Sequence, residues 1–215
     1  MATLAELTVI VTDRLGQRGD LDEMVQRELR QAQRLWEKTP PYPWWLARAW
    51  APAVSTQVTV LPDAFIEFMD DGVFLVGVYG ETPYTEPLKL AGAHLEHAYL
   101  GQDKASGQPV NFTLVGTELY MLPTPNKIYQ IASIVYWKQS ILLTPTSSNR
   151  WSDRGEDMLV AEAGYQVARS LRDAEATQRF GLDRSDARAR MRIENTSRLE
   201  SMRQAVIMAG EDALL

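Results

Sequence analysis

Two histidines, His94 and His97, are the side chains best suited to metal chemistry, and they are the only histidines in the chain. A spacing of three residues would place both on one face of a helix. Zinc hydrolases instead carry the pair four residues apart with an adjacent glutamate, and no third ligand follows here at a recognisable spacing. The chain also lacks cysteine, which excludes thiolate ligands and a cysteine nucleophile. We therefore expect no metal and no cofactor.

A second candidate for chemistry is the group of carboxylates Glu67, Asp70 and Asp71. Paired carboxylates act as acid and base in glycoside hydrolysis, so a cell-wall-degrading hydrolase is one hypothesis. Asp70-Asp71-Gly72 is also a turn sequence, because aspartate tolerates and glycine readily adopts the left-handed backbone conformation. The chain has neither the Gly-x-Ser-x-Gly pattern of serine hydrolases nor a Walker phosphate loop. We favour the turn interpretation and expect that the protein is not an enzyme.

The tryptophans are a third unusual feature, because four of the six crowd one segment that also holds Pro40, Pro41 and Pro43. Tryptophan offers a large and rigid contact area, so a glycan- or peptide-binding module is another hypothesis. One of the four, however, lies on the apolar stripe of a predicted helix. We therefore expect the set to fill the seam between helices and a β insert: Trp36, Trp44, Trp45, Trp50, Trp137 and Trp151.

Two helices are predicted in the N-terminal segment, residues 1–52. Thr3 and Glu6 form a capping-box pattern, and apolar residues then recur at helical spacing up to Leu15. Asp20 repeats the N-cap signal for a second, longer amphipathic helix. We expect this helix to end at Thr39, because the prolines that follow cannot continue it.

The middle of the chain, residues 53–150, is predicted to be a β insert. Its strands are rich in β-branched and aromatic residues, and its turns carry glycine or proline. Short strands with short turns indicate an antiparallel sandwich or barrel-like domain. Residues 91–100 are predicted as a short helix within the insert. The strands are expected near 58–61, 65–69, 73–79, 110–115, 118–122 and 128–137, with turns at 116–117 and 123–125.

Helices return in the C-terminal segment, residues 151–215. Ser152 or Asp153 is predicted to cap a helix that ends at Phe180-Gly181, and Asp183 to start a last helix that extends to about residue 209. The last helix carries a narrow apolar stripe among six arginines, a mixture that suits a protein groove. We expect the N- and C-terminal helices to form one bundle, so the predicted fold class is α+β.

Composition narrows the class of protein further. The net charge of −6 argues against broad nucleic-acid binding, which needs a basic surface. Hydrophobic residues make up 45% and charged residues 23% of the chain, as in ordinary globular proteins. No apolar run approaches the roughly 18 residues that span a bilayer, and the N-terminus lacks a signal-peptide pattern. We expect a soluble, cytosolic protein without a membrane segment.

The order of these elements, with a Pro-Thr-Pro turn in the β insert, resembles the head-to-tail adaptor proteins of tailed bacteriophages, also called connector or head-completion proteins. The similarity extends from Leu4 to about Met202. It rests on the first helix that ends in Leu15-Gly16, the Arg/Gln-rich Glu28–Gln33, the strand–turn–strand Leu119–Pro125 that leads into Tyr136, and the Ala-rich Ala161–Tyr165. The resemblance implies a helical bundle, made by both ends of the chain, around an inserted antiparallel β domain.

The resemblance further implies a structural virion protein that is made in the host cytoplasm and placed at the portal vertex. Such adaptors form a ring, usually a dodecamer, beneath the portal protein. The ring receives a tail nozzle or another tail protein and extends the channel through which double-stranded DNA leaves the capsid. The DNA would pass without sequence-specific binding. Expected partners are therefore the portal protein, a tail protein, further copies of this chain, and the passing DNA.

Two sets of residues would serve this assembly. The last helix would act as a portal-binding arm through Arg188, Met191, Arg192, Leu199, Met202, Arg203 and Val206. Ring contacts need two unlike faces on each subunit, and mixed-charge helix faces would supply them through Arg27, Arg30, Arg34, Arg169 and Arg172. The hydrolase and the tryptophan-based binding module stay open as alternatives.

Overall fold

The computed structural model describes residues 2–68, 74–78, 85–90, 106–131 and 134–212. Within these ranges, residues 74–78, 85–87, 130, 134, 199 and 202–212 are described by their backbone alone. The fold is α+β, as the sequence predicts, with five α-helices in the described part of the chain. Two compact units are present: Met1–Leu46 with Gln139–Glu200, and Ala47–Lys138 with Ser201–Leu215.

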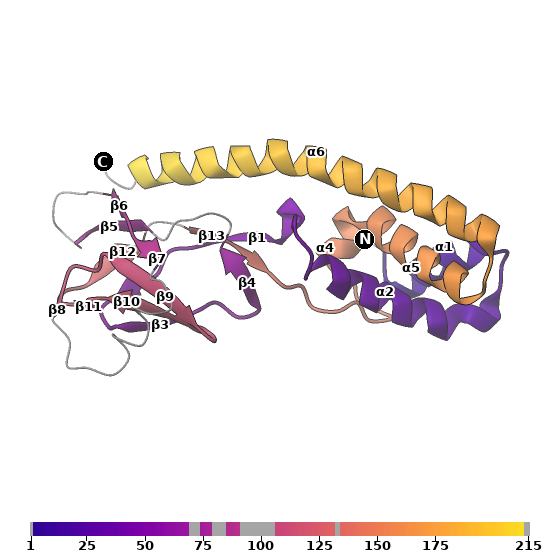
Figure 1. Cartoon of the computed structure of the whole chain (residues 1–215), viewed down its shortest axis with the longest axis horizontal. Coiled ribbons are helices and arrows are strands. Elements are labelled where there is room, and N and C mark those ends of the chain that lie inside the picture. Colours follow the sequence, from indigo (N-terminus) through magenta and orange to yellow (C-terminus); the bar gives the residue numbers. More distant parts are fainter. Residues whose placement is uncertain (1, 69–73, 79–84, 91–105, 132–133, 213–215) are drawn as a thin grey trace. The chain divides into compact units, whose positions relative to one another are not determined.

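The first unit is helical and is built from both ends of the chain (Figure 1). Its core contains large buried side chains from every helix, among them Leu7, Leu29, Trp151 and Phe180. Two 3₁₀ turns, Gly19–Leu21 and Trp44–Leu46, join the elements. The helices are α1 (Leu4–Arg14), α2 (Asp22–Trp36), α4 (Arg150–Arg154), α5 (Glu156–Ser170) and α6 (Ala174–Asp212), the last of which continues into residues grouped with the second unit.

The start of α1 confirms the predicted capping box. The Thr3 hydroxyl accepts the Glu6 N–H, and the Glu6 carboxylate accepts the Thr3 N–H at 2.7 Å. This reciprocal pair satisfies two of the donors that a helix N-terminus leaves unpaired.

The predicted cap of α2 is wrong. Asp20 lies in the 3₁₀ turn and accepts two hydrogen bonds from the Arg18 guanidinium, which lowers the pKa of Asp20. The helix begins at Asp22, with Leu21 at the N-cap position and no side-chain cap. The Asp20 carboxylate bonds to Arg18 rather than to an N–H group at the start of the helix. Burial of Leu21 holds the 3₁₀ turn in place.

The predicted helix boundaries in the C-terminal segment are also wrong. Asn149, rather than Ser152 or Asp153, caps α4 by accepting the N–H groups of Trp151 and Ser152. The chain then breaks at 171–173 and not at Phe180-Gly181. Arg172 adopts a φ of 57° there, and the Asp173 carboxylate accepts the Ala176 N–H at 2.9 Å to begin α6.

Asp183 therefore caps no helix; it lies inside α6 and pairs with Arg14 at 3.4 Å. Gly181 also lies inside α6, where Phe180 beside it is fully buried. The helix continues through this glycine because the tertiary burial of its neighbour offsets the weak helix propensity of glycine, about 1 kcal/mol below that of alanine.

The second unit contains the β insert, and the strands that the structure describes form four small sheets (Figure 1). The pairings are antiparallel except β7–β9 and β8–β11, which are parallel. None of the sheets closes into a barrel in the residues that the structure describes. In sheet order the strands are β1 (Ala47–Trp50), β13 (Ile134–Lys138) and β4 (Phe65–Phe68); β3 (Val58–Val60), β10 (Glu118–Leu122), β9 (Asn111–Val115) and β7 (Lys89–Leu90); β2 (Ala53–Val54), β12 (Tyr129–Ile131), β5 (Phe74–Val78) and β6 (Thr85–Pro87); and β8 (Ser106–Gly107) with β11 (Thr124–Pro125).

The hairpin of β9 and β10 confirms the predicted meander. Leu119 pairs with Leu114 across the hairpin, and Gly116 makes the turn with a φ of 60°, a conformation that glycine adopts without steric cost. Leu119, Met121 and Ile131 are fully buried in the core of this unit. The single strand predicted at 128–137 is instead two strands, β12 and β13, in different sheets. The helix predicted at 91–100 and the turn at 70–72 lie outside the described residues.

Candidate functional site: a buried polar hub and a charged groove

The C-terminal end of α2 carries a fully buried carboxylate, Glu37. Its Oε1 atom accepts three hydrogen bonds: from Gln33 Nε2 at 3.0 Å, from the Ser140 N–H at 3.0 Å and from Trp151 Nε1 at 2.9 Å. Its Oε2 atom accepts a charge-assisted bond from Arg34 Nη1 at 2.6 Å. A buried carboxylate is tolerated when its oxygens are satisfied in this way.

The same hub fixes the segment that leads from β13 back to the helices. Gln33 Nε2 also donates to the Ile141 carbonyl at 3.1 Å, and Gln33 Oε1 accepts the Leu143 N–H and the Asn149 amide. Asn149 donates in addition to the Ile141 carbonyl at 2.7 Å. Side chains of α2 and of the α4 cap thus pair with backbone groups of the loop after β13. Without these side chains, those backbone groups would be buried without partners.

A second clamp holds the proline- and tryptophan-rich segment against α6. The buried Asn195 side chain accepts the Trp44 N–H and donates to the Tyr42 carbonyl, both at 2.7 Å. The Trp44 ring lies 5.4 Å from the Arg198 guanidinium and 5.9 Å from that of Arg154, within the range of cation–π attraction. Both connections between helices and strands are therefore bonded to the helical unit.

Sequence reasoning named Trp44, Trp151 and Arg34 but assigned no role to Gln33, Glu37, Asn149 and Asn195, although a signal exists for one of them. Gln33 lies on the same face of α2 as the buried Val25, Leu29 and Trp36, and a polar residue on an apolar stripe needs a buried hydrogen-bond partner. One partner, Glu37, lies four residues further along the chain, whereas the other partners of Gln33 lie more than one hundred positions away. No local spacing could have named them.

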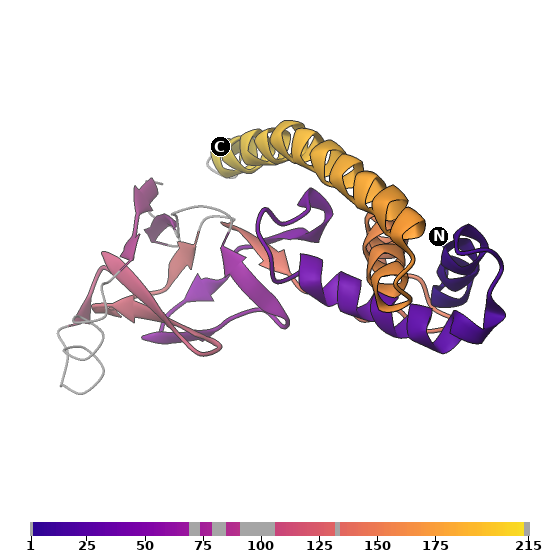
Figure 2. The ribbon, with the colours of Figure 1, turned by 45° about the vertical axis from the view of Figure 1, so that its right-hand side comes forward.

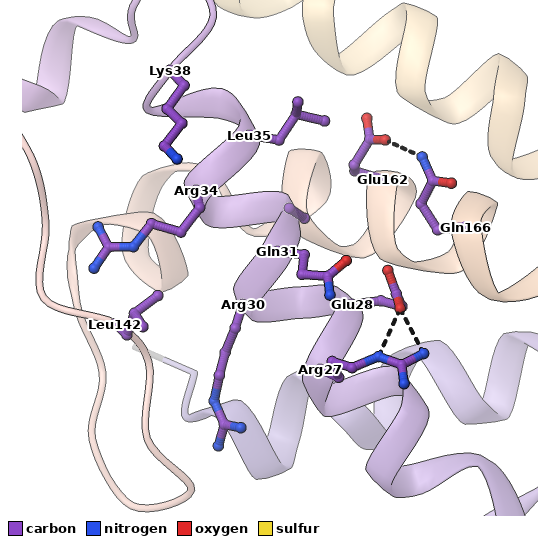
Figure 3. A pocket seen from close by; sticks show the side chains of 11 residues that line it. Arg27, Glu28, Arg30, Gln31, Arg34, Leu35, Lys38, Leu142, Glu162 and Gln166 are labelled. Carbon is purple, nitrogen blue, oxygen red and sulfur yellow. Dashed lines mark hydrogen bonds and ion pairs between the residues drawn. The ribbon is translucent and has the colours of Figure 1, made fainter.

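An open groove of about 660 Å³ lies along α2 in the helical unit. Figure 3 shows arginines of α2, and Leu142 of the loop between β13 and α4, on one side of the groove. Glu162 and Gln166 of α5 lie on the other side. Ala32 is buried in its lining, and Leu35 is 44% exposed. The full lining comprises Arg27, Glu28, Arg30, Gln31, Ala32, Arg34, Leu35, Lys38, Leu142, Glu162 and Gln166.

The charges in this groove are mixed. Arg27 pairs with Glu28 at 3.0 Å. The buried Glu162 accepts from Gln166 Nε2 at 2.9 Å, and its other oxygen lies 2.8 Å from Arg184 Nε of α6. A groove with cations on one side and a carboxylate with amides on the other can bind a helix of mixed charge. It is poorly suited to a continuous row of phosphates, which needs a single sign of charge.

The residues predicted for subunit contacts separate into two groups. Arg27, Arg30 and Arg34 all line the groove. Arg30 donates to the Leu143 carbonyl at 3.3 Å, so it also holds the loop. Arg169 instead lies over the Tyr165 ring, with its guanidinium 5.6 Å from the centroid. Arg172 is exposed at the break between α5 and α6.

The residues predicted for portal binding are likewise divided. Met191 is 3% exposed and packs inside the helical unit, and Arg188 lies over the Trp36 ring at 5.3 Å. Arg192 is exposed on α6. The side chains of the others, Leu199, Met202, Arg203 and Val206, lie outside the described part of the structure.

Most of the tryptophans are buried. Trp36, Trp45 and Trp151 belong to the helical unit, where Trp45 meets Trp151 edge to face at 5.6 Å and Trp44 at 6.0 Å. Trp50 and Trp137 lie in the paired strands β1 and β13 of the β unit. Buried rings offer no flat platform to a glycan.

Of the candidate catalytic residues, the structure describes only Glu67. Glu67 is an exposed residue of β4, opposite Trp137 in register. Asp70, Asp71, His94 and His97 lie outside the described residues. In the described ranges, no three histidine or carboxylate side chains gather as metal ligands. No helix in those ranges is both long enough and apolar enough to cross a bilayer.

No protein-family model matches this chain, and no curated protein matches it in sequence.

Proposed function

We propose that this chain is a structural virion protein, an adaptor subunit that joins the capsid portal to the tail and extends the DNA channel. The observation that supports the proposal best is the connectivity: a β unit of residues 47–138 is inserted between helices that belong to one helical unit. That arrangement is what the resemblance to phage adaptors implies. It places the two connections to the β unit on the same helical support, as a subunit with separate contact regions needs.

The long helix α6 supports the assignment of an arm. Its inner face, with the buried Phe180, Ala187, Met191 and Asn195, belongs to the helical unit. The helix extends to Asp212, and 39 residues at 1.5 Å each make it about 58 Å long. The portal-binding role is assigned to the exposed Arg192 and to the more distal Leu199, Met202, Arg203 and Val206.

The acidic character of the chain is compatible with a channel component. A net charge of −6 limits phosphate binding by the subunit as a whole. DNA that must slide past a ring should meet few strong cation contacts.

Electron microscopy of the protein mixed with the purified portal ring of its own phage tests this proposal. We expect an added layer of density with the symmetry of the portal. A matched variant that lacks residues 201–215 retains Met191 and Asn195 in the helical core and should fold but fail to add the layer. Bare portal rings with the full-length protein would refute the adaptor function.

A further inference from the structure

The outer face of the first half of α6 carries apolar side chains that the helical unit does not cover. Leu182 is 63% exposed and Ile193 is 73% exposed, and Ala189 between them is also exposed. Spacings of seven and four residues place these three side chains on one side of an α-helix. The buried Phe180 and Met191 mark the opposite side. We call Leu182, Ala189 and Ile193 the outer stripe.

The outer stripe is also bordered by charge of both signs. Asp186 and Arg192 are exposed close to it, whereas Glu194 accepts a hydrogen bond from Trp44 Nε1 at 3.3 Å. The stripe spans twelve residues of helix, from Leu182 to Ile193, whose ends are about 16 Å apart along the axis. An exposed apolar row of this kind, flanked by polar residues, is typical of an interaction surface.

The groove along α2 has a comparable length and matching chemistry. Its lining on α2 runs from Arg27 to Leu35, about 12 Å of helix, and Lys38 follows just beyond the end of the helix. Leu35 and Leu142 supply apolar contact surface, while Arg27 and Lys38 stand exposed at its ends. Lys38, at one end of the groove, complements Asp186 beside the outer stripe.

We propose that the groove of one subunit binds the outer stripe of α6 from a second copy of this chain. The inference rests on the proposed function, because it identifies the contact between neighbours in the ring. The groove and the stripe share no residue. In both views of the ribbon, α5 lies between α2 and the first half of α6 (Figures 1 and 2). One subunit can therefore donate its stripe and accept another at the same time, as a head-to-tail ring requires.

The size of this contact determines where it forms. A helix laid along the groove covers a strip roughly 16 Å long and 10 Å wide, far below the about 800 Å² per partner of a stable protein–protein interface. The free protein should therefore stay monomeric. The contact should form when subunits are held side by side, because a common support raises their effective concentration.

Cross-linking tests the contact directly, because the chain contains no cysteine of its own. Leu35→Cys places one thiol in the groove and Ile193→Cys places one on the outer stripe. We expect a mixture of the two variants, bound to portal rings and treated with a short bismaleimide, to give linked dimers. The double variant should give a ladder of multimers. Val9→Cys, at a side chain 56% exposed on α1, replaces Leu35→Cys in the control mixture, and Gln31→Cys provides a second groove position.

Charge reversal provides a second readout. Arg27→Glu with Lys38→Glu should lower the yield of linked dimers on the order of tenfold, since the new carboxylates would repel Asp186 beside the outer stripe. If the protein forms a layer on the portal but the groove and stripe variants cross-link no better than the Val9→Cys control, this inference is overturned. The adaptor function would then still stand. Absence of the layer itself would instead refute the adaptor function. Tight binding of a DNA duplex that the charge reversals abolish, without linked dimers, would assign the groove to nucleic acid and also overturn the inference.

Discussion

Replacement of Glu37 tests whether the buried polar hub stabilises the helical unit. Glu37→Ala would remove the acceptor of four hydrogen bonds. Arg34 is 32% exposed and can turn toward water, whereas the Trp151 Nε1 donor is buried. A buried donor left without a partner costs about 1–3 kcal/mol. With the Ser140 N–H and Gln33 also affected, the free energy of unfolding should fall by about 3–5 kcal/mol, the usual range for removing one partner of a buried ion pair.

Glu37→Gln provides a graded comparison. Its carbonyl oxygen can still accept from Gln33, Ser140 and Trp151, but its amide faces the Arg34 guanidinium. The loss should therefore be close to that of one charge-assisted hydrogen bond, about 1.5–3 kcal/mol.

Urea unfolding followed by circular dichroism at 222 nm measures both variants through the helices. Gln31→Ala, at an exposed position of the same helix, is the control and should change stability by less than about 0.5 kcal/mol. A Glu37→Ala variant as stable as this control would show that the hub contributes nothing. A Glu37→Gln variant less stable than Glu37→Ala would refute the assignment of the acceptor roles.

Three further predictions concern packing, a clamp and a helix cap. At Gly164 an added Cβ would lie 2.3 Å from Cε1 of the fully buried Phe180, so Gly164→Ala should lower stability by about 1–3 kcal/mol. At Gly181 the nearest atom is 3.7 Å away, so Gly181→Ala should raise stability by about 0.5–1 kcal/mol; the opposite order in thermal melts would contradict the packing of α5 on α6. Asn195→Ala should loosen the segment before Trp44, seen as faster amide exchange at the N–H of Trp44, and unchanged exchange would show that the clamp is dispensable. The hydrogen bond from the Thr3 N–H lowers the pKa of the Glu6 carboxyl in the folded protein. The ionised Glu6 therefore stabilises the fold above its unfolded-state pKa, and this stabilisation is lost as the pH falls through its folded-state pKa. Glu6→Gln should flatten the acid side of a plot of Tm against pH, and an unaltered plot would refute this linkage.

Features that depend on neighbours in the sequence were predictable. The capping box of α1 needs residues three apart, and the β9–β10 hairpin needs a glycine turn between two strands. The α+β class and the order of helices and strands follow from the same local periodicities. The wrong cap at Asp20 and the wrong break at Gly181 share one cause, because a local signal was outweighed by a competing ion pair in one case and by burial of the adjacent Phe180 in the other.

The amino-acid sequence by itself determined the class of fold, the positions of most helices and strands, and the acidic, cysteine-free composition. Only the tertiary structure decided which polar residues are buried and what they contact. Glu37 meets Ser140 and Trp151 across more than one hundred positions of sequence, and the groove forms only because α5 packs against α2. The physical reason is that periodicity reports which face of an element is apolar, whereas a hydrogen bond between distant residues depends on how those faces are packed together.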